Sequence, residues 1–313
     1  MTQFGQYPEP LHTIAHISDT HFLGGGRPLY GAIPSEQNLL KAIEQLEKSG
    51  TRPEAIVFTG DLADLAEPDA YRRLRQIVEP AAARMGSTIV WVMGNHDERF
   101  RFAADLFGEP ETTEPQDRVY DINGLRIISF DSTVPGYHHG DMSDAQLAWL
   151  ADVLATPAPH GTLLALHHPP IPTPVDLMAL IELQGQDRLA DVVRGTDVRG
   201  ILGGHLHYTT HGMFAGIPVS VAAATCYTMD LSVPQNGLSG VDGGQAFNLV
   251  HVYEDTIVHS VVPIDSFTQV TGFSDVFLDA IDAMTPEERL ETFSSKNSTF
   301  SAAEAEASGT APA

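Results

Sequence analysis

Seven side chains that suit metal coordination fall into five short clusters along the chain. They are Asp19, His21, Asp61, Asn95, His167, His205 and His207. Aspartate, histidine and asparagine suit iron, manganese, zinc or cobalt, and no cysteine is placed to make a soft thiolate site. A single ion takes about three or four protein ligands, so this set indicates two ions if one carboxylate bridges them.

Each cluster follows an apolar run that is typical of a β-strand. The runs are residues 14–17, 55–59, 89–93, 163–166 and 198–202. In open α/β sheets, ligands gather beyond the carboxyl ends of the strands, so we expect the five clusters to converge in space. A single Asp-x-His or His-x-His is usually an ordinary loop, and the prediction depends on the joint occurrence of all five.

The five motifs together resemble the calcineurin-like metallophosphoesterase superfamily over about residues 11–263. In chain order they are Asp19-Thr20-His21, Gly60-Asp61, Gly94-Asn95-His96-Asp97, His167 within Leu166-His167-His168-Pro169-Pro170, and Gly204-His205-Leu206-His207. The resemblance implies an α/β fold, a four-layer α-β-β-α sandwich of two mixed β-sheets flanked by helices. One ion would be held by Asp19, His21 and His207. The other would be held by Asn95, His167 and His205, with Asp61 between the two.

The resemblance also implies the chemistry of a binuclear phosphoesterase. The ions, iron or manganese or both with zinc and cobalt as alternatives, would clamp the attacking and leaving oxygens of an in-line displacement. Water on such an ion has a pKa of about 7, so hydroxide is the expected nucleophile. His96 matches a motif histidine that is not a metal ligand, and we expect it to stabilise the transition state or to protonate the leaving oxygen.

Further stretches resemble the class III bacterial 3',5'-cyclic-nucleotide phosphodiesterases. They are residues 16–21, 29–31, 134–140, 166–172 and 224–227. This likeness implies hydrolysis of 3',5'-cyclic AMP, and of other cyclic nucleotides, to the 5'-nucleotide. Glycerophosphodiesterases share many of these features, so a glycerophosphodiesterase or a broad hydrolase of small phosphodiesters is an alternative. A non-catalytic, metal-stabilised scaffold is disfavoured because all eight motif residues are present.

Residues around the motifs are candidates for substrate contact and for orienting the ligands. The candidate substrate-binding residues are Asn95, His96, His138 and His207. His138 lies on a glycine-bracketed loop, and an exposed loop histidine is the competing interpretation. Asp64 and Asp97 are candidates to orient ligand histidines, with surface turn carboxylates as the alternative.

The order of the predicted elements indicates how the chain is organised. Residues 1–10 read as a lead-in, residues 11–265 as the catalytic domain, and residues 266–313 as a C-terminal extension that is helical and then a disordered acidic tail. Asn123-Gly124 predicts a hairpin, and Ser143 with Gln146 predicts a capping box. Short strands between residues 208 and 263 predict a second, mostly antiparallel sheet.

Composition limits the partners. Lys and Arg number 17 against 41 Asp and Glu, a formal charge of -24, which argues against nucleic acid and requires bound cations to attract a phosphate substrate. No apolar run reaches the roughly 18 residues that cross a bilayer, and no secretory signal is visible. We therefore expect a cytoplasmic protein. The resemblance implies that its substrate is a small-molecule phosphodiester. The resemblance also suggests a homodimer.

Overall fold

The computed structural model describes residues 3–234, 238–270, 272–273 and 275–298. The chain divides into a larger unit, Pro10–Asp265, and a smaller unit made of Met1–Glu9 and Ser266–Ala313. Most of the predicted disordered tail lies outside the described residues.

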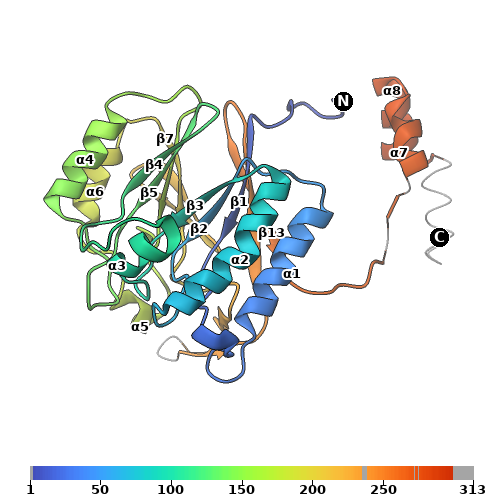
Figure 1. Cartoon of the computed structure of the whole chain (residues 1–313). Coiled ribbons are helices and arrows are strands. Elements are labelled where there is room, and N and C mark those ends of the chain that lie inside the picture. Colours follow the sequence, from blue (N-terminus) through green and yellow to red (C-terminus); the bar gives the residue numbers. More distant parts are fainter. Residues whose placement is uncertain (1–2, 235–237, 271, 274, 299–313) are drawn as a thin grey trace. The chain divides into compact units, whose positions relative to one another are not determined.

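Two mixed β-sheets form the centre of the larger unit (Figure 1). The first sheet has the order β13-β12-β1-β2-β3, with β13 Ile257–Pro263, β12 Ala246–Val252, β1 His12–Ile17, β2 Ala55–Thr59 and β3 Thr88–Val92. The second has the order β4-β5-β6-β7-β9-β8, with β4 Arg118–Ile122, β5 Leu125–Phe130, β6 Thr162–Leu166, β7 Val198–Gly203, β9 Ile217–Val221 and β8 Thr210–Phe214. Within each sheet, the strands that precede the metal motifs run parallel to one another: β1 with β2, β2 with β3, and β6 with β7. Their carboxyl ends therefore lie at the same edge of that sheet.

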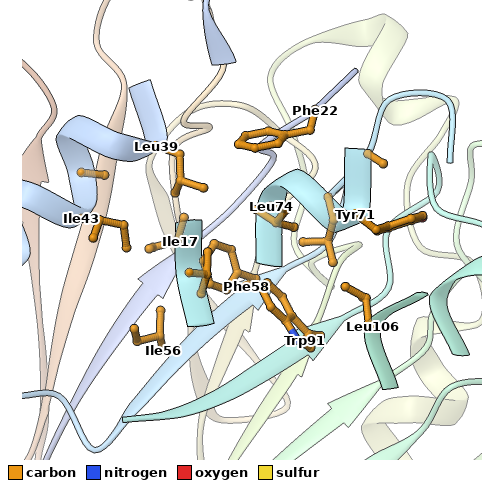
Figure 2. Packing of buried hydrophobic residues seen from close by; sticks show 14 of the residues in the cluster. Ile17, Phe22, Leu39, Ile43, Ile56, Phe58, Tyr71, Leu74, Trp91 and Leu106 are labelled. Atoms are coloured by element: carbon orange, nitrogen blue, oxygen red, sulfur yellow. The ribbon is translucent and has the colours of Figure 1, made fainter. Parts of the chain in front are cut away.

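Helices cover the outer face of each sheet (Figure 1). On the first sheet lie α1 (Ser35–Lys48) and α2 (Pro68–Met85), whose apolar side chains meet those of β1, β2 and β3 in Figure 2. On the second sheet lie α4 (Asp144–Leu154) and α6 (Gln186–Val193). The shorter helices of this unit are η1 Gly24–Gly26, α3 Arg99–Arg101, the π-helical turn η2 Phe102–Leu106 and α5 Asp176–Ala179. The layers are therefore α-β-β-α, which confirms the expected fold class.

Two local predictions hold and one wider prediction does not. The hairpin joins β4 to β5 at Asn123-Gly124, and Ser143 caps α4 reciprocally with Gln146. The expectation of a separate antiparallel sheet between residues 208 and 263 is wrong, because β8 and β9 extend the second sheet while β12 and β13 extend the first. Turn residues predict a hairpin but carry no information on which sheet edge the hairpin joins, and pairing with an existing edge satisfies the backbone groups that a new sheet would expose.

Two histidines lie on the strand faces that meet between the sheets. His16 on β1 has no exposed surface, shares a face with Ile14 and bonds through Nε2 to the hydroxyl of Thr59 at 2.9 Å. Burial lowers the pKa of His16 to about 3, and burial together with His211 lowers that of His259 to about 4. Both rings are therefore neutral in the folded protein at neutral pH.

These low pKa values predict that the protein loses stability in mild acid. The unfolded chain binds protons at histidine below its ordinary pKa of about 6.5, whereas the folded chain does not, so the stabilisation is complete above that pH and is lost as the pH falls toward 3. At pH 5 the loss from His16 is about 2 kcal/mol, and His259 adds to it. Urea unfolding at pH 7 and pH 5 measures this loss. The His259→Gln protein should lose less between the two pH values than the wild type or a His139→Gln control, and equal losses in all three would contradict the prediction.

The described part of the smaller unit includes three helical elements. It contains α7 (Asp275–Asp282), α8 (Pro286–Arg289) and the π-helical turn η3 (Leu290–Ser294). Thr285 caps α8 reciprocally with Glu288. Among all the residues described in the chain, no helix combines the length and apolarity needed to span a bilayer.

Candidate metal centre

The first group of ligand atoms comes from Asp19, His21, Asp61 and His207. One donor atom from each of these four buried side chains lies within 4.8 Å of the others. His21 Nε2 is 3.2 Å from His207 Nε2 and 3.4 Å from Asp61 Oδ2. His207 Nε2 is 3.3 Å from Asp19 Oδ1. Two nitrogens and two carboxylates around one point are suited to a borderline divalent or trivalent cation.

A second group adjoins the first through Asp61. His167 Nε2 lies 3.0 Å from Asn95 Oδ1 and 3.3 Å from Asp61 Oδ2. The His205 ring is 5.0 Å from that of His167. Because Asp61 Oδ2 is close to a histidine nitrogen of each group, Asp61 would contact both ions if each group held one.

Each of the four candidate ligand histidines has one ring nitrogen bound to an acceptor outside the groups. The pairs are His21 Nδ1 with Asp64 Oδ1 at 2.9 Å, His167 Nδ1 with the Thr59 carbonyl at 2.7 Å, His205 Nε2 with the Ile181 carbonyl at 3.0 Å, and His207 Nδ1 with the Tyr227 carbonyl at 3.1 Å. If the ring proton is assigned to these nitrogens, the other nitrogen of each ring presents a lone pair to the centre. Sequence patterns cannot reveal the three carbonyl acceptors, because any residue type supplies a carbonyl.

This assignment tests whether metal ions fit. His21 Nε2 faces His207 Nε2 at 3.2 Å, and His167 Nε2 faces the oxygen of Asn95 at 3.0 Å. Two lone pairs at such distances repel each other unless positive charge lies between them, and either cations or protons can supply it. The donor set therefore fits two metal ions.

The carboxylates attract positive charge to the same place. Burial alone lowers the pKa of His167, but Asp61 beside it, together with Asp19 and the Thr59 carbonyl, more than offsets this and raises the pKa to about 8. The histidines at 3.3 and 3.4 Å overcome the effect of burial on Asp61 and hold its pKa well below the ordinary range. Because a cation replaces protons at these nitrogens, metal binding should release protons and strengthen as the pH rises.

The backbone is strained at most of the candidate ligands. Asp19, His21, Asp61, His205 and His207 all have φ between 44° and 69°, a left-handed conformation that such residues seldom adopt. The loops are also closely packed, since a Cβ on Gly94 would lie 2.0 Å from the Asp61 nitrogen. Only glycine fits there, which accounts for the Gly94-Asn95 pair in physical terms.

Asp64 and Asp97 take different positions. Asp64 Oδ1 is 2.9 Å from His21 Nδ1 and 3.5 Å from His96 Nδ1, so Asp64 orients a ligand histidine as expected. Asp97 instead accepts hydrogen bonds from the backbone of Leu62, Ala63 and Gly94 and from the Tyr71 hydroxyl. Its candidate role as an acceptor for a ligand histidine is therefore wrong, and it joins the loops after β2 and β3. Burial, with Asp61 nearby, raises the pKa of Asp97 to about 6.

Replacing Asp64 with asparagine should weaken metal binding without unfolding the protein. The amide keeps the size of the side chain but removes the charge that holds His21, and losing such an outer partner typically lowers metal affinity or activity about 10- to 100-fold. Competition with a chelator, followed by metal analysis, measures the affinity. An Asp64→Asn protein with wild-type affinity would contradict this role.

His96 and His138 stand at the exposed side of the centre. The His96 backbone amide donates a hydrogen bond to Asp61 Oδ1 at 2.8 Å. The His96 ring is 29% exposed, and a hydrogen bond between its Nδ1 and the Asp64 carbonyl at 2.9 Å holds it in place. The exposed His138 accepts at Nδ1 from the Asn95 amide at 2.9 Å, and its ring is 5.2 Å from that of His96. His168, which the sequence did not assign to the site, fixes this loop through Nε2 on the His138 carbonyl at 3.0 Å.

The fold and these two joined ligand groups define a class of protein, and comparison identifies it. Residues 12–209 match the family model of calcineurin-like phosphoesterases, and the chain belongs to this family. The expected family membership is confirmed.

Individual relatives differ in their similarity. A cAMP/cGMP dual specificity phosphodiesterase of Mycobacterium tuberculosis is 58% identical over 268 residues, covering 86% of this chain and 84% of the relative. A glycerophosphodiester phosphodiesterase of Enterobacter lignolyticus is 29% identical over 219 residues, covering 68% of this chain and 77% of the relative. A dimetal phosphatase structure from Danio rerio has a TM-score of 0.59 at 18% identity, covering 82% of this chain and 98% of that one, which supports the fold alone.

Proposed function

We propose that this protein is a binuclear metal-dependent phosphodiesterase that hydrolyses 3',5'-cyclic AMP, and other cyclic nucleotides, to the 5'-nucleotide. The position of Asp61 Oδ2, 3.4 Å from His21 Nε2 and 3.3 Å from His167 Nε2, carries the binuclear part of the proposal. The cyclic-nucleotide part is supported by the Mycobacterium relative and by a probable cyclic nucleotide phosphodiesterase of Rhodococcus erythropolis. The latter is 55% identical over 265 residues, covering 85% of this chain and 88% of the relative.

Seven residues would hold the two metal ions. Asp19, His21 and His207 would hold one ion, Asn95, His167 and His205 the other, and Asp61 both. Two bound ions, for which we propose iron or manganese with zinc or cobalt as alternatives, would activate water and neutralise the phosphoryl oxygens.

His96 has the geometry of a proton donor. With Nδ1 donating to the Asp64 carbonyl, a protonated ring presents Nε2-H away from that carbonyl. As water attacks phosphorus and the bond to the ribose 3'-oxygen breaks, this proton would pass to the leaving oxygen. Asn95, His138 and His207 would contact the substrate around the phosphate.

A nearby arginine is already engaged, which favours diesters over monoesters. Arg99 donates to Asp131 at 2.9 Å, to the Thr133 carbonyl at 3.0 Å and to the Thr113 carbonyl at 3.2 Å. The Arg99 guanidinium is therefore already hydrogen-bonded within the protein. It offers no unpaired positive charge to bind a phosphomonoester dianion.

Turnover by the purified, manganese-reconstituted protein tests the proposal. The substrates are 3',5'-cyclic AMP, glycerophosphodiesters, a chromogenic bis-aryl phosphate and the corresponding monoester, with Asn95→Ala as the blank. We expect cyclic AMP to give 5'-AMP in the wild type and little product in the blank. Bis-aryl hydrolysis with little cyclic AMP turnover would move the substrate to another diester, such as a glycerophosphodiester. No turnover on any ester would favour a non-catalytic scaffold.

The homodimer and the cytoplasmic location stay predictions. Light scattering at working concentration tests the first, and a monomer would contradict it. Fractionation of the source cells tests the second.

A further inference from the structure

A pocket of about 380 Å³ lies beside the metal centre. Its lining includes Tyr30 and Ile33 from the segment after β1, together with Tyr227 and Met229, and the Tyr30 and Tyr227 rings are in edge-to-face contact. The two-stranded ribbon of β10 (Thr228–Met229) and β11 (Gly240–Val241) contributes to the enclosure. Its volume falls within the roughly 300–1,000 Å³ that is usual for small-molecule sites.

The pocket wall is fixed directly to a candidate metal ligand. His207 Nδ1 donates to the Tyr227 carbonyl at 3.1 Å, and the Met229 amide donates to the His207 carbonyl at 3.2 Å. The Tyr227 ring lies between two others, with centroids 4.5 Å from His207 and 5.6 Å from Tyr30. Gly240 packs against Tyr227, since a Cβ there would be 2.8 Å from the ring. The distance between pocket and metal centre is therefore set by packed and hydrogen-bonded groups.

The lining suits an uncharged, planar group that carries hydrogen-bond donors. Asp242 is the only charged side chain among the described residues of the lining, so the pocket offers no cation to a phosphate. Tyr30 is 72% exposed and its φ is 52°, a strained backbone that nevertheless keeps an aromatic ring at the pocket. Every nucleobase can stack on such a ring through its π face. Adenine and guanine also carry amino groups that can donate a hydrogen bond to a carboxylate.

We propose that this pocket is a nucleobase subsite, which receives the purine of a cyclic nucleotide while its phosphate lies at the metal centre. The inference rests on the proposed function and deepens it. Because stacking does not distinguish adenine from guanine strongly, the subsite accepts both purines. Aromatic rings and a carboxylate also suit a quaternary ammonium group, so the choline of a glycerophosphodiester is the competing occupant.

Calorimetric binding to the manganese-reconstituted protein tests the subsite. The probes are 5'-AMP, ribose 5-phosphate and glycerophosphocholine, and the proteins are wild type, Tyr30→Ala, Tyr30→Phe and a Met213→Ala control on the exposed face of β8. The wild type should bind 5'-AMP about tenfold or more tightly than ribose 5-phosphate. Tyr30→Ala should lose most of that preference with an unchanged Kd for ribose 5-phosphate, while Tyr30→Phe and Met213→Ala should keep it.

Three results would overturn the subsite. They are equal wild-type affinity for the two phosphates, an equal loss of both in Tyr30→Ala, and a loss confined to glycerophosphocholine. Failure of the proposed function is seen separately, in wild-type cyclic AMP turnover. Cyclic AMP turnover without a Tyr30-dependent preference for 5'-AMP would support the proposed function and contradict the subsite. A Tyr30-dependent preference for 5'-AMP without cyclic AMP turnover would support the subsite and contradict the proposed function.

Discussion

Replacing Asp61 with asparagine should abolish phosphodiester hydrolysis and lower the metal content together. Asp61 Oδ2 faces a histidine of each ligand group, so the amide removes a negative charge that both ions would share. Loss of one preorganised electrostatic partner typically costs about 10²- to 10³-fold in rate, and we expect about 10³-fold or more because two ions depend on this group. Metal analysis by mass spectrometry should show fewer than two ions per chain.

An Asp152→Asn protein is the matched control, because Asp152 lies on the exposed side of α4. It should keep both activity and metal content. Asp61→Asn should also keep its circular dichroism spectrum, since Asp61 belongs to a loop rather than to the apolar cores. Full metal content in Asp61→Asn would show that Asp61 is not a bridging ligand.

The His96→Ala protein should separate turnover from metal binding. His96 contacts the centre through its backbone and through Asp64, and the proposed ligand set excludes its ring. Losing a general acid typically costs about 10²- to 10⁴-fold, so kcat should fall by that amount while two ions remain bound. The alkaline side of the pH-rate profile should also change, because a general acid acts only while it is protonated and this proton donor is gone.

A substrate with a good leaving group provides the internal control. An aryl phosphodiester needs little protonation of its leaving oxygen, so His96→Ala should impair it less than cyclic AMP. Equal losses of activity and metal would place His96 among the ligands and contradict the proposed role. Equal impairment of both substrates would assign His96 to stabilising the phosphoryl group instead.

The sequence predicts that the candidate ligands converge, because the motifs combine residue type with position after a strand. Asp61 and His167 belong to different sheets, yet both follow a buried parallel strand, and this rule brings them together. The sequence could not predict which sheet β8 and β12 join, because pairing in the folded protein, rather than the local sequence pattern, decides it. Backbone acceptors such as the Ile181 carbonyl were equally hidden, since they come from loops whose path the side chains do not specify.

The two candidate outer carboxylates show the same limit on a smaller scale. Asp64 closely follows one motif and Asp97 is the last residue of another, yet only Asp64 bonds to a candidate ligand histidine. The sequence marks residues 29–31 and 224–227 as similar to cyclic-nucleotide phosphodiesterases, but it does not show that they form one pocket. Tyr30 and Tyr227 are far apart in sequence, and neither lies in one of the five metal motifs.

Because the candidate ligands come from both sheets, bound metal ions would cross-link the two sheets. Asp19, His21, Asp61 and Asn95 follow strands of the first sheet, whereas His167, His205 and His207 follow strands of the second. Bound ions would therefore tie together segments such as His21 and His207, which are 186 residues apart, in a chain whose single cysteine excludes an internal disulfide. Any ion that binds only the folded chain stabilises it by mass action. The same coordination bonds would then serve catalysis and hold the two sheets together. Selection for catalytic activity would therefore also preserve this stabilisation of the fold.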